Sequence, residues 1–241
     1  MPDFAKSRDH SIQKMFDRIA CRYDLLNRVI SFRLDTRWRK EAIRALLKDG
    51  NEVLLDLGTG TGDLTFTAVK RLSQKGRILG LDFSFRMLWL AKAKRDRVLN
   101  GDKTQFVQGS ALAPPFKDAS FDGIMTAFVL RNISDLRLFF EQAYLLLKPG
   151  GRLVSLDMFP PAGRLFSSLY SIYFHRFMPL IGGFLARDRH AYQYLSDTVR
   201  HFDPPETITG LIRDGGFELV TMRKFLHGAV CLHIADKPLS N

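Results

Sequence analysis

The spacing of apolar residues along the chain changes from helical to strand-like after about residue 50. Before that point apolar residues recur at helical intervals from Ser11 to Leu47, with arginines between them, and Asn27 and Ser31 suggest a break between helices. The segment 38–47 has the pattern of an amphipathic helix that ends at Asp49-Gly50. We expect these N-terminal helices to cap one face of the fold.

Short apolar runs then alternate with amphipathic segments. Strands are predicted at 53–57, 78–82, 105–108, 121–127 and 153–156. Helices are predicted between them at about 62–73, 85–99 and 136–147. The sequence Lys148-Pro149-Gly150-Gly151 predicts a turn, since a helix cannot continue through it. Strands that alternate with helices form right-handed βαβ units, so we predict an α/β fold with a doubly wound, mostly parallel sheet.

Two later segments depart from this alternation. Residues 160–203 are rich in aromatic and apolar side chains, and a helix pair that bends at Pro179 and Gly182-Gly183 is the simplest structure for them. After a helix at about 204–214, strands at 217–226 and 229–235 flank His227-Gly228 as an antiparallel hairpin and bring the sheet to seven strands. We therefore predict a single domain over 1–241, made of N-terminal helices (1–50), a ligand-binding core (51–159), a helical lid insertion (160–203), and a helix with the terminal hairpin (204–241).

Composition is that of a globular protein in a reducing compartment. Hydrophobic residues make up 46% of the 241 residues and charged residues 25%, which is ordinary for a soluble domain. Cys21 and Cys231 are far apart and belong to no paired motif, so neither a disulfide framework nor a cysteine metal site is expected. We expect no signal peptide and no membrane span, and we predict a cytoplasmic protein.

The net charge of +11 suggests nucleic acid or an anionic membrane face as a partner. Solubility alone explains the same surplus. Because no block of five or more basic residues occurs, charge does not choose among these readings.

The most informative stretch is 53–63, where a buried strand runs into Gly58, Gly60 and Gly62. Glycines permit a tight turn, and the N-terminus of the helix that follows presents free N–H groups to a polar ligand. A dinucleotide-binding turn has the spacing G-x-G-x-x-G, which leaves room for a pyrophosphate. This tighter turn has Asp56 before it, to attract an ammonium group, and Asp82 after the next strand, to bind ribose hydroxyls. We therefore predict S-adenosylmethionine as the cofactor.

Further contacts with the same ligand follow from the ends of the strands. Ser110-Ala111 come just after the third strand, where a polar residue would meet the edge of the adenine. Phe83 or Met87 could pack on the adenine ring, although both fit equally well as core residues. Ala127 ends the fourth strand and would line the methionine tail through its backbone.

Several motifs resemble those of the demethylmenaquinone and ubiquinone-precursor C-methyltransferases, which are class I enzymes that use S-adenosylmethionine. The resemblance extends from about Phe16 to Pro238 and is carried by residues 16–20, 23–27, 55–57, 60–64, 128–132, 147–153 and 192–195. The Tyr-Asp-x-x-Asn start, the Arg131-Asn132 pair and the Tyr-x-Tyr-Leu segment are specific together, whereas the glycine-rich turns are common to many methyltransferases. The chain departs from the family at four positions. The family usually has Gly where Val129 stands and Asn or Asp where Ser110 stands. It often has Ser where Ala127 stands and usually Glu where Asp157 stands.

The resemblance implies a Rossmann-like methyltransferase fold and methyl transfer to a ring carbon of a reduced polyprenyl quinone precursor. Demethylmenaquinol is the first choice of acceptor, and S-adenosylhomocysteine is the second product. The resemblance would also place Thr61 at the cofactor, together with Asp82, Ser110-Ala111 and Ala127.

Ring-carbon methylation needs a nucleophilic carbon, which a hydroquinone provides once one hydroxyl is deprotonated. Arg131 is permanently cationic and follows the fourth predicted strand, so we expect it to stabilise the phenolate. Asn132 could position the second hydroxyl. An arginine is a poor general base, so proton removal is assigned to water or to Tyr23.

The predicted partners follow from the lid. Its aromatic helices carry Arg164, Arg176, Arg187 and Arg189, which would suit an anionic membrane that holds the polyprenyl tail. An extra helical layer of core explains the lid equally well, so peripheral membrane contact and a homodimer are both left open.

Other functional classes fit the sequence less well. His227 and His233 share one face of a strand but lack a third ligand, so we predict no metal. Asp203-Pro204-Pro205 lies far from the fourth strand and is followed by Glu206 instead of an aromatic residue, which argues against a nucleic-acid methyltransferase. The glycine spacing disfavours a nicotinamide dehydrogenase. The alternatives retained are a methyltransferase for another small aromatic or lipid acceptor, and a non-catalytic binding module with the same fold.

Overall fold

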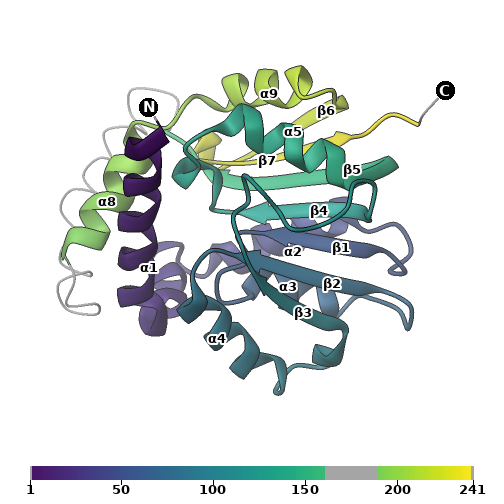
Figure 1. Cartoon of the computed structure of the whole chain (residues 1–241), viewed down its shortest axis with the longest axis horizontal. Helices are drawn as coiled ribbons and strands as arrows, with labels where there is room; N and C mark the ends of the chain where they lie inside the picture. Colours follow the sequence, from purple (N-terminus) through teal and green to yellow (C-terminus); the bar gives the residue numbers. More distant parts are fainter. Residues whose placement is uncertain (1, 161–188, 240–241) are drawn as a thin grey trace.

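The computed structural model describes residues 2–160 and 189–239, and its centre is a twisted seven-stranded sheet with helices on both faces (Figure 1). The strands are β1 (Val53–Leu57), β2 (Arg77–Asp82), β3 (Thr104–Gln108), β4 (Phe121–Ala127), β5 (Leu147–Met158), β6 (Glu218–Phe225) and β7 (Val230–Asp236). The α-helices are α1 (Pro2–Ile30), α2 (Leu34–Leu46), α3 (Asp63–Val69), α4 (Phe85–Arg95), α5 (Leu136–Leu146), α8 (Arg189–Arg200) and α9 (Pro205–Asp214). Short 3-10 turns are η1 (Gly101–Lys103), η2 (Leu130–Asn132) and η4 (Leu226–Gly228).

The sheet has the order β3-β2-β1-β4-β5-β7-β6. All neighbouring strands are parallel except β7, which runs antiparallel to both β5 and β6. The doubly wound, mostly parallel sheet with a terminal hairpin is therefore confirmed. Strand order reverses between β1 and β4, and in such sheets the carboxyl ends of the strands open a ligand-binding crevice at that point.

Two apolar clusters fill the space on either side of the sheet. Leu54 of β1 packs with residues of α2 and α3 on one face, whereas Leu55 and Leu57 pack with residues of α5 and α9 on the other. The alternation follows from the two-residue period of a strand, and burial on both faces explains why β1 is almost entirely apolar. Residue 56 therefore shares the face of Leu54, which matters for the site.

Several element boundaries differ from the predictions, among them the end of α4, which lies at Arg95 and not at residue 99. Helix α1 continues through Asn27 and ends at Ile30, and the chain turns at 31–33, where Phe32 and Arg33 adopt positive φ angles of 49° and 63°. Helix α3 stops at Val69, and the chain beyond it is fixed by the Ser73 N–H donating to the carbonyl of Gly50. Strand β5 begins at Leu147, before the predicted turn, and residues 148–151 bulge within it as the pairing with β4 shifts register.

The N-terminal helices have two different positions. Helix α2 covers one face of the sheet, against β4, β5 and β7, as predicted. Helix α1 contacts α4, α2 and α8 and lies across the end of the sheet, beside α8 (Figure 1). Its polar side chains reach the loops after the strands: Gln13 Nε2 donates to the Phe83 carbonyl (2.7 Å), and Arg28 Nη2 donates to Asp63 (2.8 Å).

Most of the predicted lid lies outside the described residues. Residues 189–200 of this segment form helix α8, in keeping with the helical structure expected for 160–203. The expected bend at Pro179 and Gly182-Gly183 lies outside the described residues. Among the helices that the structure describes, none is long and apolar enough to cross a membrane.

Candidate active site

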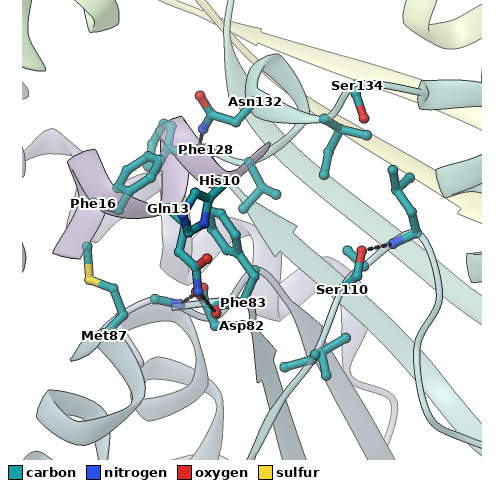
Figure 2. Close-up of a pocket in the computed structure, with 18 of the residues that line it drawn as sticks. His10, Gln13, Phe16, Asp82, Phe83, Met87, Ser110, Phe128, Asn132 and Ser134 are labelled. Atoms are coloured by element: carbon teal, nitrogen blue, oxygen red, sulfur yellow. Dashed lines mark hydrogen bonds between the residues drawn. The ribbon is translucent and has the colours of Figure 1, made fainter. Parts of the chain in front are cut away.

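A cavity of about 330 Å³ opens where the loops after β1, β2, β3 and β4 meet helix α1 (Figure 2). Its volume falls at the lower end of the range of about 300–1,000 Å³ that is usual for small-molecule sites. Nine of the predicted cofactor-binding and catalytic residues line it: Tyr23, Gly58, Gly60, Asp82, Phe83, Met87, Ser110, Ala111 and Asn132.

The glycine turn forms the floor of this cavity. The N–H groups of Gly58 and Thr59 both donate to the carbonyl of Leu81, at 2.8 and 2.9 Å, so the turn is fixed to the end of β2. Gly58 has a φ of +74°, and a Cβ there would come within 2.5 Å of Val129 Cγ2, so only glycine fits. A Cβ on Gly60 would meet no atom within 4 Å, so the backbone at Gly60 faces open space that a ligand can occupy.

Asp82 is placed to receive hydroxyl groups in the cavity. Its carboxylate accepts the Gly60 N–H at 2.8 Å and the Ser84 N–H at 2.9 Å, which fixes its orientation. Burial raises the pKa of Asp82 to about 6, while the two backbone donors oppose the rise. Each carboxylate oxygen can accept more than one hydrogen bond, so the pair of oxygens suits the two vicinal hydroxyls of a ribose.

Asp56 lies beneath the turn and does not line the cavity. Its Oδ2 accepts hydrogen bonds from the hydroxyls of Thr59 (2.8 Å) and Thr65 (2.7 Å), and the residue is 1% exposed. Burial raises the pKa of Asp56 to about 6. This geometry makes Asp56 a support of the turn, and direct contact with a cofactor stays a prediction.

Three other predicted cofactor residues also lie outside the cavity wall. The Thr61 hydroxyl donates to Asp24 of α1, Gly62 is the N-cap of α3, and Ala127 packs against the core on the α2 face. Their predicted contact with the cofactor is untested.

Arg131 lines a second, smaller cavity of about 40 Å³ between α1, η2 and α8. It is 9% exposed, and its Nη1 donates to Asp157 Oδ1 at 2.6 Å. Asp157 also accepts the N–H groups of Leu130 (2.8 Å) and Met158 (2.7 Å). Burial raises the pKa of Asp157, and the Arg131 guanidinium opposes that rise. The arginine is thus held by a buried carboxylate beside the main cavity.

Tyr23 and Asn132 line both cavities, and so does Phe16. Asn132 Oδ1 accepts a hydrogen bond from the Tyr194 hydroxyl at 3.0 Å. Burial raises the pKa of Tyr23, while the charge of Arg131 lowers it. Tyr23 therefore keeps its proton at neutral pH and serves better as a hydrogen-bond donor than as a base.

Comparison with known proteins decides the family. The model of the ubiE/COQ5 methyltransferase family matches residues 4–237. A demethylmenaquinone methyltransferase of Thermotoga maritima is 41% identical over 215 residues, 89% of this chain and 90% of that protein. One of Thermus thermophilus is 38% identical over 224 residues, 93% of this chain and 100% of that protein. The chain belongs to the ubiE/COQ5 methyltransferase family.

A solved structure agrees with this assignment at the level of the fold. A SAM-dependent methyltransferase of Thermotoga maritima superposes with a TM-score of 0.66 at 18% identity, covering 93% of this chain and 98% of that protein. The Rossmann-like methyltransferase fold that the resemblance implied is therefore confirmed. As a member of the ubiE/COQ5 family, the chain is a methyltransferase, which also confirms the predicted enzyme class.

Helix α1 contributes wall residues that sequence reasoning did not assign to the site. His10, Gln13 and Phe16 line the main cavity, as do Phe128 and Ser134 from the loop after β4 (Figure 2). The contact of Gln13 with the Phe83 carbonyl joins residues 70 positions apart, so no local pattern announces it. Phe16 and Phe128 each open a stretch that resembles the family, and these were the available signals.

The two histidines that were considered as ligands do not share a strand face, because His227 is exposed in the η4 turn and only His233 belongs to β7. His233 is buried and its Nε2 lies 3.0 Å from the Pro205 carbonyl, while burial lowers its pKa. Within residues 2–160 and 189–239, no three His, Cys, Asp or Glu side chains gather in a way that could hold a metal ion.

Proposed function

We propose that this protein transfers a methyl group from S-adenosylmethionine to a ring carbon of demethylmenaquinol, yielding menaquinol and S-adenosylhomocysteine. One observation carries the proposal: a cavity with a glycine turn and Asp82 adjoins a chamber with a buried arginine, and the two share Phe16, Tyr23 and Asn132. Such an arrangement sets a methyl donor beside an acceptor that must carry negative charge. The two relatives named demethylmenaquinone methyltransferase support the choice of acceptor.

The residues of the main cavity fit the proposed cofactor. Asp82 would bind the ribose, the open backbone at Gly60 would lie against the methionine tail, and Phe83 and Met87 would pack against the adenine. Ser110 would meet the polar edge of the base. When bound, S-adenosylmethionine supplies an electrophilic methyl group on a sulfonium.

Arg131 has the central role at the acceptor. Its positive charge favours the ionised form of the quinol, whose negative charge spreads onto the ring carbon that forms the new bond. Asp157 holds the guanidinium in place by a 2.6 Å ion pair. Tyr23 also lines the chamber and can donate a hydrogen bond to the ionised oxygen of the quinol. Apolar side chains around the chamber exclude water, and the ring proton released after transfer passes to solvent.

A substrate with a polyprenyl tail implies that the enzyme contacts lipid. Helix α4 has an exposed face with aromatic and basic side chains that could make this contact. Phe85 and Trp89, four positions apart on one helix face, are 62% and 59% exposed, and Arg86 and Lys92 are exposed beside them. We propose that this face contacts anionic membranes. Sedimentation with phosphatidylglycerol vesicles should fall several-fold for Trp89→Ser, and equal sedimentation of variant and wild type would contradict the proposal. A homodimer remains a prediction.

Incubation with methyl-labelled S-adenosylmethionine tests the reaction. Anaerobically reduced demethylmenaquinone and a reduced ubiquinone-pathway benzoquinone would be compared by mass spectrometry. We expect label in the ring of the naphthoquinol. Label only in another acceptor would refute the proposed substrate, and tight calorimetric binding of NAD without binding of S-adenosylmethionine would refute the methyltransferase.

A further inference from the structure

Two buried hydrogen-bond donors face the same small cavity and have no partner among the described residues. They are the side-chain amide nitrogen of Asn27 and the Nε of Arg131, and both residues line the 40 Å³ chamber. A buried donor without a partner costs about 1–3 kcal/mol, so such groups are rare in folded proteins. Two of them in one chamber indicate a ligand that accepts hydrogen bonds.

The rest of the chamber restricts what that ligand can be. Met15, Ile19, Leu26 and Ile30 of α1 give it apolar walls, and no carboxylate is among the residues that line it. A cation would find no counter-charge there, whereas an anionic oxygen on a flat apolar ring would meet two N–H donors and one positive charge. A phenolate has this chemistry.

Tyr23 is the polar neighbour of Asn27. A side-chain hydrogen bond from Asn27 would favour the ionised phenol, and this interaction lowers the pKa of Tyr23 against the larger effect of burial. By the distance and angles of a normal hydrogen bond, however, the Asn27 nitrogen has no partner among the described residues. Asn132 differs, because its oxygen already accepts the Tyr194 hydroxyl and its amide contacts the Phe128 carbonyl at 3.5 Å.

We propose that Asn27 is an acceptor-binding residue whose amide, together with Arg131 Nε, receives one ring oxygen of the substrate as its phenolate. The inference rests on the proposed function, since it names the residues that hold the acceptor of that reaction. Part of the positioning of the acceptor hydroxyls, which was predicted for Asn132 from the sequence, is thereby assigned to Asn27 of α1. The proposal also explains why an uncharged amide lies among the apolar residues of α1 that line the chamber.

Three substitutions of Asn27 test the proposal. Asn27→Leu removes the donor at similar volume, Asn27→Asp replaces it with a negative charge, and Asn27→Gln keeps a donor. Leu25→Ala, at a half-exposed position on the same helix outside both cavities, is the matched control. A hydrogen bond to a charged group is worth about 1.5–3 kcal/mol, so Asn27→Leu should lower kcat/KM for short-chain demethylmenaquinol by about 10- to 150-fold.

Two further measurements separate this role from a merely structural one. The affinity for S-adenosylmethionine should stay within about threefold of wild type in calorimetry. The acidic limb of the pH profile of kcat, which reports ionisations in the enzyme–substrate complex, should move to higher pH in Asn27→Leu, because the bound acceptor ionises less readily. Asn27→Gln should recover part of the loss. A loss of kcat/KM with an unmoved pH profile of kcat would overturn the assignment.

A chromophoric probe gives a readout without turnover. 4-Nitro-1-naphthol absorbs differently as naphthol and naphtholate, so its apparent pKa in the site can be followed by titration. Wild type should lower that pKa, Asn27→Leu should lower it less, and Asn27→Asp should abolish the effect. Equal probe pKa values in all folded variants would mean that the amide binds only water, and would refute the proposal.

The same probe keeps this inference distinct from the proposed function. If wild type methylates no quinol but still lowers the probe pKa through Asn27, the proposed reaction is wrong and the anion subsite stands. If quinol methylation is normal in Asn27→Leu, the reaction stands and the role of Asn27 is wrong. Circular dichroism melts establish that each variant is folded. If the Leu variant is not folded, the Asp variant, which also lacks the N–H donor, takes its place.

Discussion

Replacing Asp157 with asparagine would leave Arg131 as a buried cation without its counter-ion. The side chains of the pair are 6% and 1% exposed, so solvent cannot substitute for the lost charge. Asp157 also accepts the backbone N–H groups of Leu130 and Met158, one on each oxygen. An asparagine has only one acceptor oxygen, so at least one of these three donors would lose its partner.

The magnitude follows from the burial of the pair. Breaking a buried ion pair by removing one partner costs about 3–5 kcal/mol. For a chain of this size each kcal/mol corresponds to about 2–4 °C in Tm, so Asp157→Asn should melt about 6–20 °C below wild type. Turnover should fall as well, because Arg131 would no longer be held beside the acceptor, whereas cofactor affinity should change little.

Urea denaturation, thermal melts and calorimetry with S-adenosylmethionine would measure these effects. The double variant Arg131→Met/Asp157→Asn is the control, since it removes the buried cation while the asparagine oxygen remains as an acceptor for the backbone N–H groups of Leu130 and Met158. It should recover part of the stability lost in Asp157→Asn and none of the turnover. If Asp157→Asn melted within about 2 °C of wild type, the ion pair would not have the structural weight given to it here.

Three further predictions concern the cofactor cavity. Calorimetry should detect no S-adenosylmethionine binding to Asp82→Ala, whereas Arg131→Ala should bind it and lose turnover; normal turnover by Arg131→Ala would rule out its role. Since the raised pKa of Asp82 is about 6 and its ionised form accepts hydroxyls best, affinity should fall about tenfold per pH unit below 6 in wild type and stay flat in Asp82→Asn. Gly58→Ala would force its Cβ against Val129, so binding should weaken at least tenfold, and Gly58→Ala/Val129→Gly should recover part of it.

The raised pKa values also predict how the ligand-free protein responds to acid. Asp56 and Asp82 both have pKa values of about 6 in the folded chain, above their ordinary value of 3.8. The folded state therefore binds more protons than the unfolded state between those pH values. The stability that these two groups contribute is present below pH 3.8 and is lost as the pH rises through 6. Cofactor binding at Asp82 should consequently release a proton near pH 6.

The strands and the glycine turn could be predicted because their signals are local. An apolar run that ends in G-x-G-x-G specifies a strand, a turn and a helix start within eleven residues, and Asp82 follows at the end of the next strand. The orientation of Asp56 was available from the same local information. It alternates with Leu55 and Leu57, so it must share the face of Leu54, under α3, where Thr65 meets it.

The role of α1 could not be predicted in the same way. The spacing of its apolar residues predicts that one side of α1 is buried, but it does not predict which element that side packs against. The contacts that fix the position of α1, such as the hydrogen bond from Gln13 to the Phe83 carbonyl, join segments that are distant in the sequence. Arg131 shows a related limit. Its place after β4 was predictable, whereas its burial and its pairing with Asp157 depend on the register of β4 against β5 and on the turn η2.

Helix α1 links the two halves of the proposed reaction. Phe16 and Tyr23 lie seven residues, or about two turns, apart, so they project from the same face, and both line the two cavities. In the proposed reaction the methyl group would cross at a wall that α1 supplies, with Asn132 as a further shared residue. Changes at Asp82 should affect the cofactor alone and changes at Arg131 the acceptor alone, whereas changes at Tyr23 should affect both. The proposed methyl transfer therefore predicts a requirement for α1, a helix that lies across the end of the sheet.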